Sequence, residues 1–96
     1  MSPTARYRAS ERALLTELGD GTAVLLDLDS KFYFTLNETA VCMWKLLAAG
    51  DVSREQLAAQ LCRDYAVAAS DASADVDAVL DMLTRERLVT VSAAAP

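Results

Sequence analysis

Few residues of this chain have the types and spacing that catalysis or metal binding requires. The sequence contains no histidine, so it lacks the commonest general base, and its two cysteines, Cys42 and Cys62, form no CxxC pair. Both cysteines are expected to be small buried hydrophobic residues of two different helices. The glycines fall at predicted turns or helix ends rather than in a phosphate-binding loop: Gly19, Gly21 and Gly50. We therefore expect no metal, no cofactor and no enzymatic activity.

The acidic residues give two further candidates for chemistry. Asp27 and Asp29 share one face of an expected strand, so they can form a carboxylate pair, although a solvated strand end explains them more simply. A third predicted helix carries four aspartates, which form either its solvated face or a surface for a basic or N–H-rich partner: Asp71, Asp75, Asp77 and Asp81.

The strongest candidate is the backbone itself, in the segment from residue 21 to 44. Residues 22–29 and 32–36 read as two strands joined by a short polar turn, and Asn37 caps the helix that follows. Because the chain leaves for a helix, nothing in the sequence covers the second strand. A strand at the edge of a sheet offers unpaired N–H and C=O groups that a peptide can complete. This pattern predicts a binding module.

The remaining elements follow from periodicity and capping signals. A further strand is expected at residues 13–18 and a last extended segment at 88–91. Helices are expected at residues 38–49, from the Ser53 capping box to about residue 65, and from about 70–73 to 87. This order predicts an α+β, winged-helix-like fold, with a three-stranded antiparallel meander followed by three helices. The expected organisation is a flexible N-terminal arm over 1–10, one domain over 11–91 and a C-terminal tail over 92–96.

Alternation and helical spacing predict which side chains face the core. In the aromatic strand, Phe32, Phe34 and Leu36 are expected to face inward, whereas Tyr33 and Thr35 face outward. The helical stripes predicted to pack inward include Ala40, Met43, Trp44 and Leu47 in the first helix and Val76, Val79, Leu80 and Leu83 in the third.

Composition excludes several classes of function. Nine basic and fourteen acidic residues give a net charge of −5, the opposite of the balance that a phosphate-binding surface needs. No apolar run reaches the roughly 18 residues of a membrane span, and no apolar stretch follows the N-terminal arginines as in a signal peptide. A cytoplasmic protein without nucleic-acid or membrane partners is expected.

The stretch VLLDLDSKFYFTLNETAVCMWKLL resembles the PqqD-like family. This family comprises peptide chaperones of pyrroloquinoline quinone biosynthesis and precursor-recognition proteins of lasso-peptide and other ribosomal peptide pathways. The resemblance spans residues 13–89 and includes Asp27-Leu28-Asp29, Leu36-Asn37-Glu38-Thr39, Trp44, Asp75-Val76, Leu80, Leu83 and Leu88-Val89. The chain departs from the family in having Ser30-Lys31 where a turn glycine is common, and Ala68-Ala69-Ser70 before the third helix.

The resemblance implies a non-catalytic module that binds the leader segment of a precursor peptide as an added strand and presents it to a maturation enzyme. Examples of such an enzyme are a radical-SAM protein, a protease and a cyclase. The implied contacts are Lys31, Phe32, Tyr33, Phe34 and Thr35 on the strand, and Asp75, Val79, Met82, Leu83 and Glu86 on the third helix.

Two alternatives remain open at this point. The first is a winged-helix DNA-binding regulator, against which the aspartates of the third helix argue, because Asp75, Asp77 and Asp81 would oppose phosphates. The second is a plain dimerisation or scaffold domain, in which copies associate through the edge strand or by domain swapping.

Overall fold

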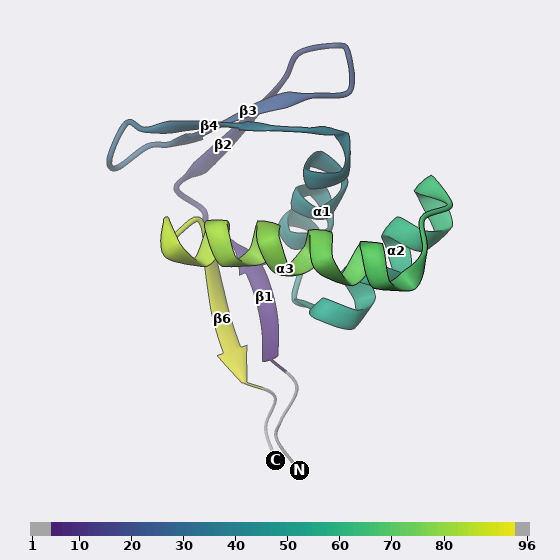
Figure 1. Cartoon of the computed structure of the whole chain (residues 1–96). Helices are drawn as coiled ribbons and strands as arrows, with labels where there is room; N and C mark the ends of the chain where they lie inside the picture. Colours follow the sequence, from purple (N-terminus) through teal and green to yellow (C-terminus); the bar gives the residue numbers. More distant parts are fainter. Residues whose placement is uncertain (1–4, 94–96) are drawn as a thin grey trace.

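The structure is a computed structural model that describes residues 5–93. Six strands and three helices follow one another in the described chain as β1 (Ala5–Ala9), β2 (Ala13–Glu17), β3 (Ala23–Asp27), β4 (Tyr33–Leu36), α1 (Glu38–Ala49), β5 (Val52–Ser53), α2 (Arg54–Tyr65), α3 (Ala69–Arg85) and β6 (Val89–Ala93). The strands form two antiparallel sheets, in the orders β2-β3-β4 and β5-β1-β6 (Figure 1). The expected α+β, winged-helix-like class, with a meander followed by three helices, is confirmed.

The meander packs against the start of α1 through a tight turn. Asp20 accepts a hydrogen bond from the Thr22 backbone N–H at 2.9 Å, which closes the turn between β2 and β3. Gly21 lies in this turn at φ 91°, and a Cβ there would stand 2.7 Å from Cγ of Glu38. The position therefore needs glycine both for its left-handed backbone and for the close approach of the α1 N-terminus.

Helix starts are set by local capping, as the sequence predicts. The Asn37 side chain accepts from the Ala40 N–H at 2.9 Å and so begins α1. Ser53 and Gln56 form the expected capping box of α2, with hydrogen bonds of 3.2 and 2.8 Å. In contrast, α3 begins at Ala69 without a side-chain cap, slightly before the expected polar start.

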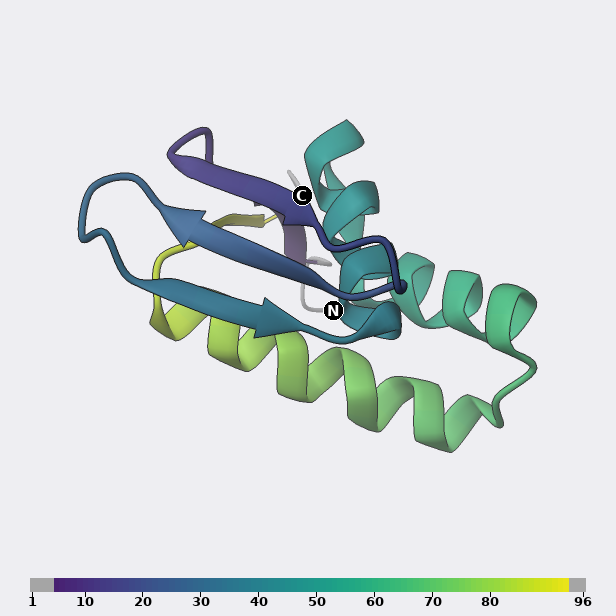
Figure 2. The same cartoon turned by 90° about the horizontal axis from the view of Figure 1, so that it is seen from above.

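The core lies between the inner face of the meander, the three helices and β1. Its completely buried side chains include Leu25, Met43, Leu47, Leu57, Leu61, Val76 and Leu83, and Trp44 is buried as expected. Cys42 and Cys62 are half-buried free cysteines that pack against this cluster. Figure 2 shows α3 running beside β4 along one flank of the meander.

The expected N-terminal arm is wrong for residues 5–9, because they form β1, the central strand of the second sheet. Residues 92 and 93 of the expected tail likewise belong to β6, which pairs with β1, while 1–4 and 94–96 lie outside the described residues. Tyr7 anchors β1 in the core at 9% exposure. The adjacent Arg6 and Arg8 give residues 5–9 a polar sequence that does not indicate a buried strand. The strand that pairs with β1 over its whole length, β6, lies at the other end of the chain.

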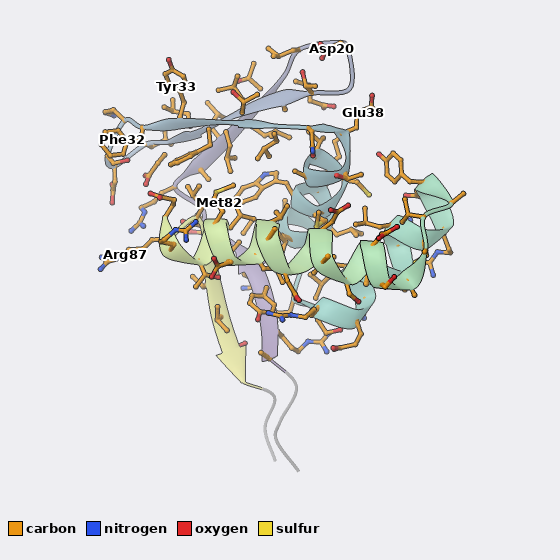
Figure 3. All side chains as sticks on the ribbon, viewed as in Figure 1. Asp20, Phe32, Tyr33, Glu38, Met82 and Arg87 are labelled. Atoms are coloured by element: carbon orange, nitrogen blue, oxygen red, sulfur yellow. The ribbon has the colours of Figure 1, made fainter. Side chains whose placement is uncertain are left out.

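Phe32 is also placed differently from expectation. We expected it on the core face with Phe34 and Leu36, but its side chain is 65% exposed. It precedes β4, and the left-handed backbone of Lys31 (φ 68°) turns the chain immediately before it. Within β4 the alternation holds, since Phe34 is half-buried and Leu36 is buried. Figure 3 places Phe32 and Tyr33 at the far end of the meander from Asp20.

Among the described residues, no helix has the length and apolar character needed to cross a lipid bilayer.

The role of β1 can be tested by truncating its anchor. We expect Tyr7→Ala to lower the free energy of unfolding by roughly 3 kcal/mol, since it empties a buried aromatic site and removes the acceptor of the 3.2 Å hydrogen bond from Arg54. Arg8→Ala is the matched control on the same strand, because the exposed Arg8–Asp51 ion pair contributes at most about 1 kcal/mol. Urea denaturation of both variants measures the difference. Equal stability of the two variants would contradict the role of Tyr7 as the anchor of β1.

Candidate binding groove between an edge strand and a helix

Within residues 5–93, strand β4 is hydrogen-bonded on one side only. The sheet order is β2-β3-β4, so the side of β4 away from β3 is open. The register pairs Leu25 with Phe34 and Leu26 with Tyr33. Next to these pairs, the Asp27 N–H donates to the Phe32 carbonyl at 2.8 Å, which identifies 27–32 as a hydrogen-bonded pair.

The alternation of antiparallel pairing then decides which residues of β4 face the open side. Because hydrogen-bonded pairs recur every second residue, Phe34 and Leu36 direct their N–H and C=O groups toward β3. Tyr33 and Thr35 belong to the non-hydrogen-bonded pairs, so their backbone groups point away from the sheet. The open edge therefore offers two N–H donors and two C=O acceptors within the plane of the meander.

A hollow of 340 Å³ lies beside this edge. Its lining combines β4, the first turn of α1 and α3, and consists of Thr22, Thr35, Leu36, Asn37, Ala40, Val79 and Met82. Figure 1 shows α3 below the meander, and Figure 2 shows it along the β4 flank of the meander. An extended segment placed along β4 would therefore have backbone partners on one side and apolar side chains of α3 on the other.

The α3 residues expected to contact a peptide lie on one face of the helix, with the exception of Leu83. Val79, Met82 and Glu86 are half-buried and lie at helical spacing on one face, while Asp75 is exposed on the same stripe one turn earlier. Leu83 is completely buried and contacts the core, so it supports α3 from beneath and exposes no surface to a ligand. Figure 3 shows Met82 on the side of α3 nearest to the meander.

Sequence reasoning missed the contribution of α1 to the hollow. Asn37 and Ala40 close one end of it, at the first turn of α1, and Thr22 joins them from the turn before β3. The signal was available, because the Asn37 cap fixes the helix start directly after β4 and Ala40 is small enough to leave space. Of the expected strand contacts, Lys31 and Phe32 precede β4 and are exposed, as is Tyr33 within it, whereas Phe34 is half-buried beneath the strand.

The turn that leads into β4 is held by an ionised carboxylate. Asp27 accepts a hydrogen bond from the Asp29 N–H at 2.9 Å, and this bond is the largest cause of a lowered pKa of Asp27. Burial opposes the shift, whereas hydrogen bonds from the Ser30 backbone and hydroxyl and the charge of Arg12 lower the pKa further. Asp27 is therefore a structural residue of the β3–β4 turn, and Asp29 is exposed and pairs with Arg12 at 3.3 Å.

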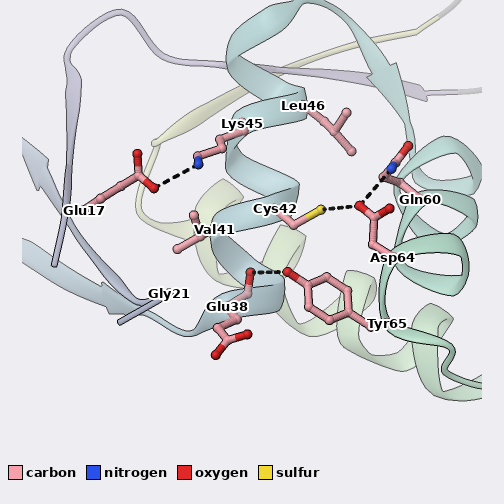
Figure 4. Close-up of a pocket in the computed structure, with 10 residues that line it drawn as sticks. All are labelled: Glu17, Gly21, Glu38, Val41, Cys42, Lys45, Leu46, Gln60, Asp64 and Tyr65. Atoms are coloured by element: carbon pink, nitrogen blue, oxygen red, sulfur yellow. Dashed lines mark hydrogen bonds and ion pairs between the residues drawn. The ribbon is translucent and has the colours of Figure 1, made fainter. Parts of the chain in front are cut away.

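A second hollow, of 430 Å³, lies between α1, α2 and the β2–β3 turn (Figure 4). Cys42 in this hollow donates to Asp64 at 3.6 Å, and Gln60 donates to the same carboxylate at 2.8 Å. Burial, and next the Asp64 carboxylate, raise the pKa of the Cys42 thiol, so it is a poor nucleophile at neutral pH. No group of three or more metal-ligating side chains occurs among residues 5–93.

Comparison with known proteins gives one family and two solved structures. The model of the family described as Coenzyme PQQ synthesis protein D (PqqD) matches residues 22–89. The structure described as TbiB1 in complex with the TbiA(beta) leader peptide has a TM-score of 0.74 and 26% identity, over 85% of this chain and 93% of that chain. Lasso peptide synthetase B1 complexed with the leader peptide has a TM-score of 0.72 and 28% identity, over 88% and 96%. No curated protein matches the sequence.

The charge on Asp27 makes a testable contribution at the turn before β4. Its pKa is lower in the folded chain than the value of about 3.9 of an unfolded chain. The carboxylate therefore stabilises the fold above that pH, and the stabilisation is lost as pH falls through the folded pKa. We expect Asp27→Asn to reduce the thermal midpoint at pH 7 and to flatten its decline below about pH 5. Asp75→Asn is the control, and a wild-type acid profile for Asp27→Asn would contradict this role.

Proposed function

This chain belongs to the PqqD family, and on that premise we propose that it recognises the leader segment of a ribosomally made precursor peptide. The observation that carries the proposal is the open edge of β4 beside an apolar hollow. The two leader-peptide complexes support it, because each is similar over most of both chains. The leader segment binds here as a fourth strand of the meander.

The backbone contacts of this strand go to Tyr33 and Thr35. Their outward N–H and C=O groups pair with alternate residues of the guest, so about five extended residues are enough to use all four groups. These bonds supply affinity without reading the sequence of the guest, because every peptide has the same backbone. Lys31 and Phe32 contact the guest where it passes the exposed end of the hairpin.

Selectivity comes from the side chains on α3. Every second guest side chain points into the hollow, where Val79 and Met82 offer apolar contact and Phe34 lies beneath the strand. Asp75 and Glu86 lie on the same face of α3 on either side of this apolar pair and contact polar parts of the guest. Leu83 is buried in the core and does not contact the guest. It holds α3 at a distance from β4 that leaves room for an added strand.

The proposed role is presentation rather than catalysis. The chain holds the leader segment while a maturation enzyme, such as a radical-SAM protein, a protease or a cyclase, acts on the rest of the precursor. When this chain holds the leader segment and also binds the enzyme, the remaining segment of the precursor has a higher local concentration at the enzyme.

The charge of α3 favours a peptide over nucleic acid as the partner. Asp77 pairs with Arg54 at 2.6 Å and Asp81 with Arg85 at 3.3 Å, so the basic residues near the exposed face are offset by carboxylates. Asp75 adds a further negative charge beside the hollow. We expect no sequence-dependent retention of duplex DNA at physiological salt, measured by electrophoretic mobility shift.

Proline substitutions along β4 test the docking edge. Phe34→Pro removes an N–H that bonds to β3 and should lower the free energy of unfolding by roughly 3 kcal/mol. Tyr33→Pro and Thr35→Pro remove outward N–H groups, so the chain should stay folded while its affinity for the leader peptide falls about tenfold. The probe is a synthetic, fluorescently labelled leader peptide, chosen as one that the wild-type chain binds, and it is titrated after circular dichroism melts of each variant. Normal affinity in both folded variants would exclude this edge.

Variants of α3 test the groove independently of the strand. Met82→Asp places a charge in the apolar hollow and should weaken the leader peptide at least about tenfold. Thr84→Asp is the matched control, because Thr84 is exposed on another face of the same helix. Leu83→Ala should instead lower the free energy of unfolding by about 3 kcal/mol, because its side chain is buried. If Thr84→Asp weakens the peptide as much as Met82→Asp, the guest lies elsewhere.

A further inference from the structure

The hollow between α1, α2 and the β2–β3 turn is separate from the proposed leader groove, because the two linings have no residue in common. Its volume of 430 Å³ is within the range of ligand sites, about 300–1,000 Å³. The residues that α1 contributes to it recur at helical spacing on one face: Glu38, Val41, Cys42 and Lys45. The chain therefore has a second concave surface, which leader recognition leaves unused.

The lining of this hollow is acidic. Three of its side chains are carboxylates, those of Glu17, Glu38 and Asp64, and one is a cation, that of Lys45. Lys45 pairs with Glu17 at 2.9 Å. Within residues 5–93, neither Glu38 nor Asp64 forms an ion pair. The hollow therefore has an excess of negative charge that a cationic guest would neutralise.

The charges just outside the lining leave this excess in place. On the α2 side, Arg63 donates a hydrogen bond to Gln60. On the side of the β2–β3 turn, Asp20 precedes Gly21, and the hydrogen bond from the Thr22 side chain lowers the pKa of Asp20, which is therefore ionised at neutral pH. One added cation and one added carboxylate offset each other.

The Asp64 carboxylate is held in place through one of its oxygens only. Its Oδ2 accepts hydrogen bonds from Nε2 of Gln60 at 2.8 Å and from the Cys42 thiol at 3.6 Å (Figure 4). No side chain of the described part of the chain donates to Oδ1. The two bonds orient the carboxylate before a guest arrives, which lowers the entropic cost of binding.

Tyr65 gives the hollow an aromatic wall. Its hydroxyl donates to the Glu38 carbonyl at 3.3 Å, so the ring bridges α2 and the first turn of α1 (Figure 4). Burial, and next the charges of Cys42, Glu38 and Asp64, raise the pKa of Tyr65, so the hydroxyl keeps its proton at neutral pH. A guanidinium group stacks on an aromatic ring and forms paired hydrogen bonds with a carboxylate. The hollow provides both kinds of partner.

We propose that this hollow binds an arginine side chain of a second protein, with the guanidinium group between the ring of Tyr65 and Oδ1 of Asp64. The negative excess of the lining selects a cation, and the planar guanidinium uses the ring and the carboxylate together, which a compact ammonium group does less well. The leader groove and this hollow can be filled at the same time. A protein that acts on a bound precursor can therefore dock here without displacing the leader segment, although the inference does not rest on leader recognition.

Titration of the isotope-labelled chain with the tripeptide acetyl-Gly-Arg-Gly-amide, up to about 20 mM, tests the proposal by amide chemical shifts. The shifts should concentrate on Cys42, Gln60, Asp64 and Tyr65, with a dissociation constant in the millimolar range or below. The same tripeptide with citrulline in place of arginine has nearly the same shape without the charge, and it should bind about tenfold more weakly. The lysine tripeptide should also bind more weakly than the arginine tripeptide.

Variants of the lining separate a binding role from a structural one. Asp64→Asn should weaken the arginine tripeptide about tenfold, whereas the control Glu55→Gln removes a carboxylate from the first turn of the same helix and should bind normally. Tyr65→Ala should weaken the tripeptide, and Tyr65→Phe, which keeps the ring, should retain it. Lys45→Gln removes the cation of the lining and should strengthen binding. Thermal melts of every variant exclude unfolding as the cause.

Four results would overturn this assignment. The first is an absence of shifts in the hollow at the highest concentration of the arginine tripeptide. The second is a citrulline or lysine tripeptide that binds as well as the arginine one, and the third is normal binding by Asp64→Asn. The fourth is displacement of the tripeptide by the leader peptide, which would assign the hollow to the precursor instead of a second protein. Unchanged leader affinity of Asp64→Asn keeps this test separate from that of the peptide function.

Discussion

In the described part of the chain, strand β4 pairs its backbone on one side only, and the arrangement of the groove depends on this constraint. Pairing with β3 consumes the N–H and C=O groups of Phe34 and Leu36, which leaves those of Tyr33 and Thr35 directed outward. Unpaired backbone groups remain tolerable at an edge because water reaches them. The edge stays available only if no other part of the chain pairs with it. The turn before β4 and the helices α1 and α3 are placed so that none of them pairs with this edge.

Each neighbour of β4 holds a boundary of the groove at a fixed position. The ionised Asp27 closes the turn before the strand, and the Asn37 cap begins α1 directly after it. The buried Leu83 anchors α3 in the core, while Val79 and Met82 on the adjacent face remain half-buried beside the strand. The same helix thus contributes one stripe to stability and another to the hollow. A substitution in the buried stripe of α3 would shift the position of the groove, although the substituted residue itself contacts no ligand.

How much of the structure the sequence predicts depends on how far apart in the chain the interacting residues lie. The bounds of α1 and the start of α2 were predicted because caps and stripes act within a few residues. Strand β1 was missed because its partner β6 lies at the other end of the chain and Tyr7 is its one buried side chain. Phe32 was misplaced because the left-handed Lys31 interrupts the alternation just before β4. The strand half of the groove was expected, whereas the end formed by Asn37 and Ala40 was missed, although α1 begins directly after β4.

In the proposed binding mode, the groove separates affinity from selectivity. The edge of β4 reads only an extended backbone, so its contribution is the same for any guest and survives most side-chain changes within the strand. In the proposed binding mode, the hollow reads guest side chains through Val79 and Met82, which are half-buried and pack against the edge of the core. In that mode, substitutions at these two positions alter which peptide is bound at a smaller cost in stability than substitutions at the buried Leu36 or Leu83. A scaffold of this kind can retain one docking mode while its choice of peptide changes.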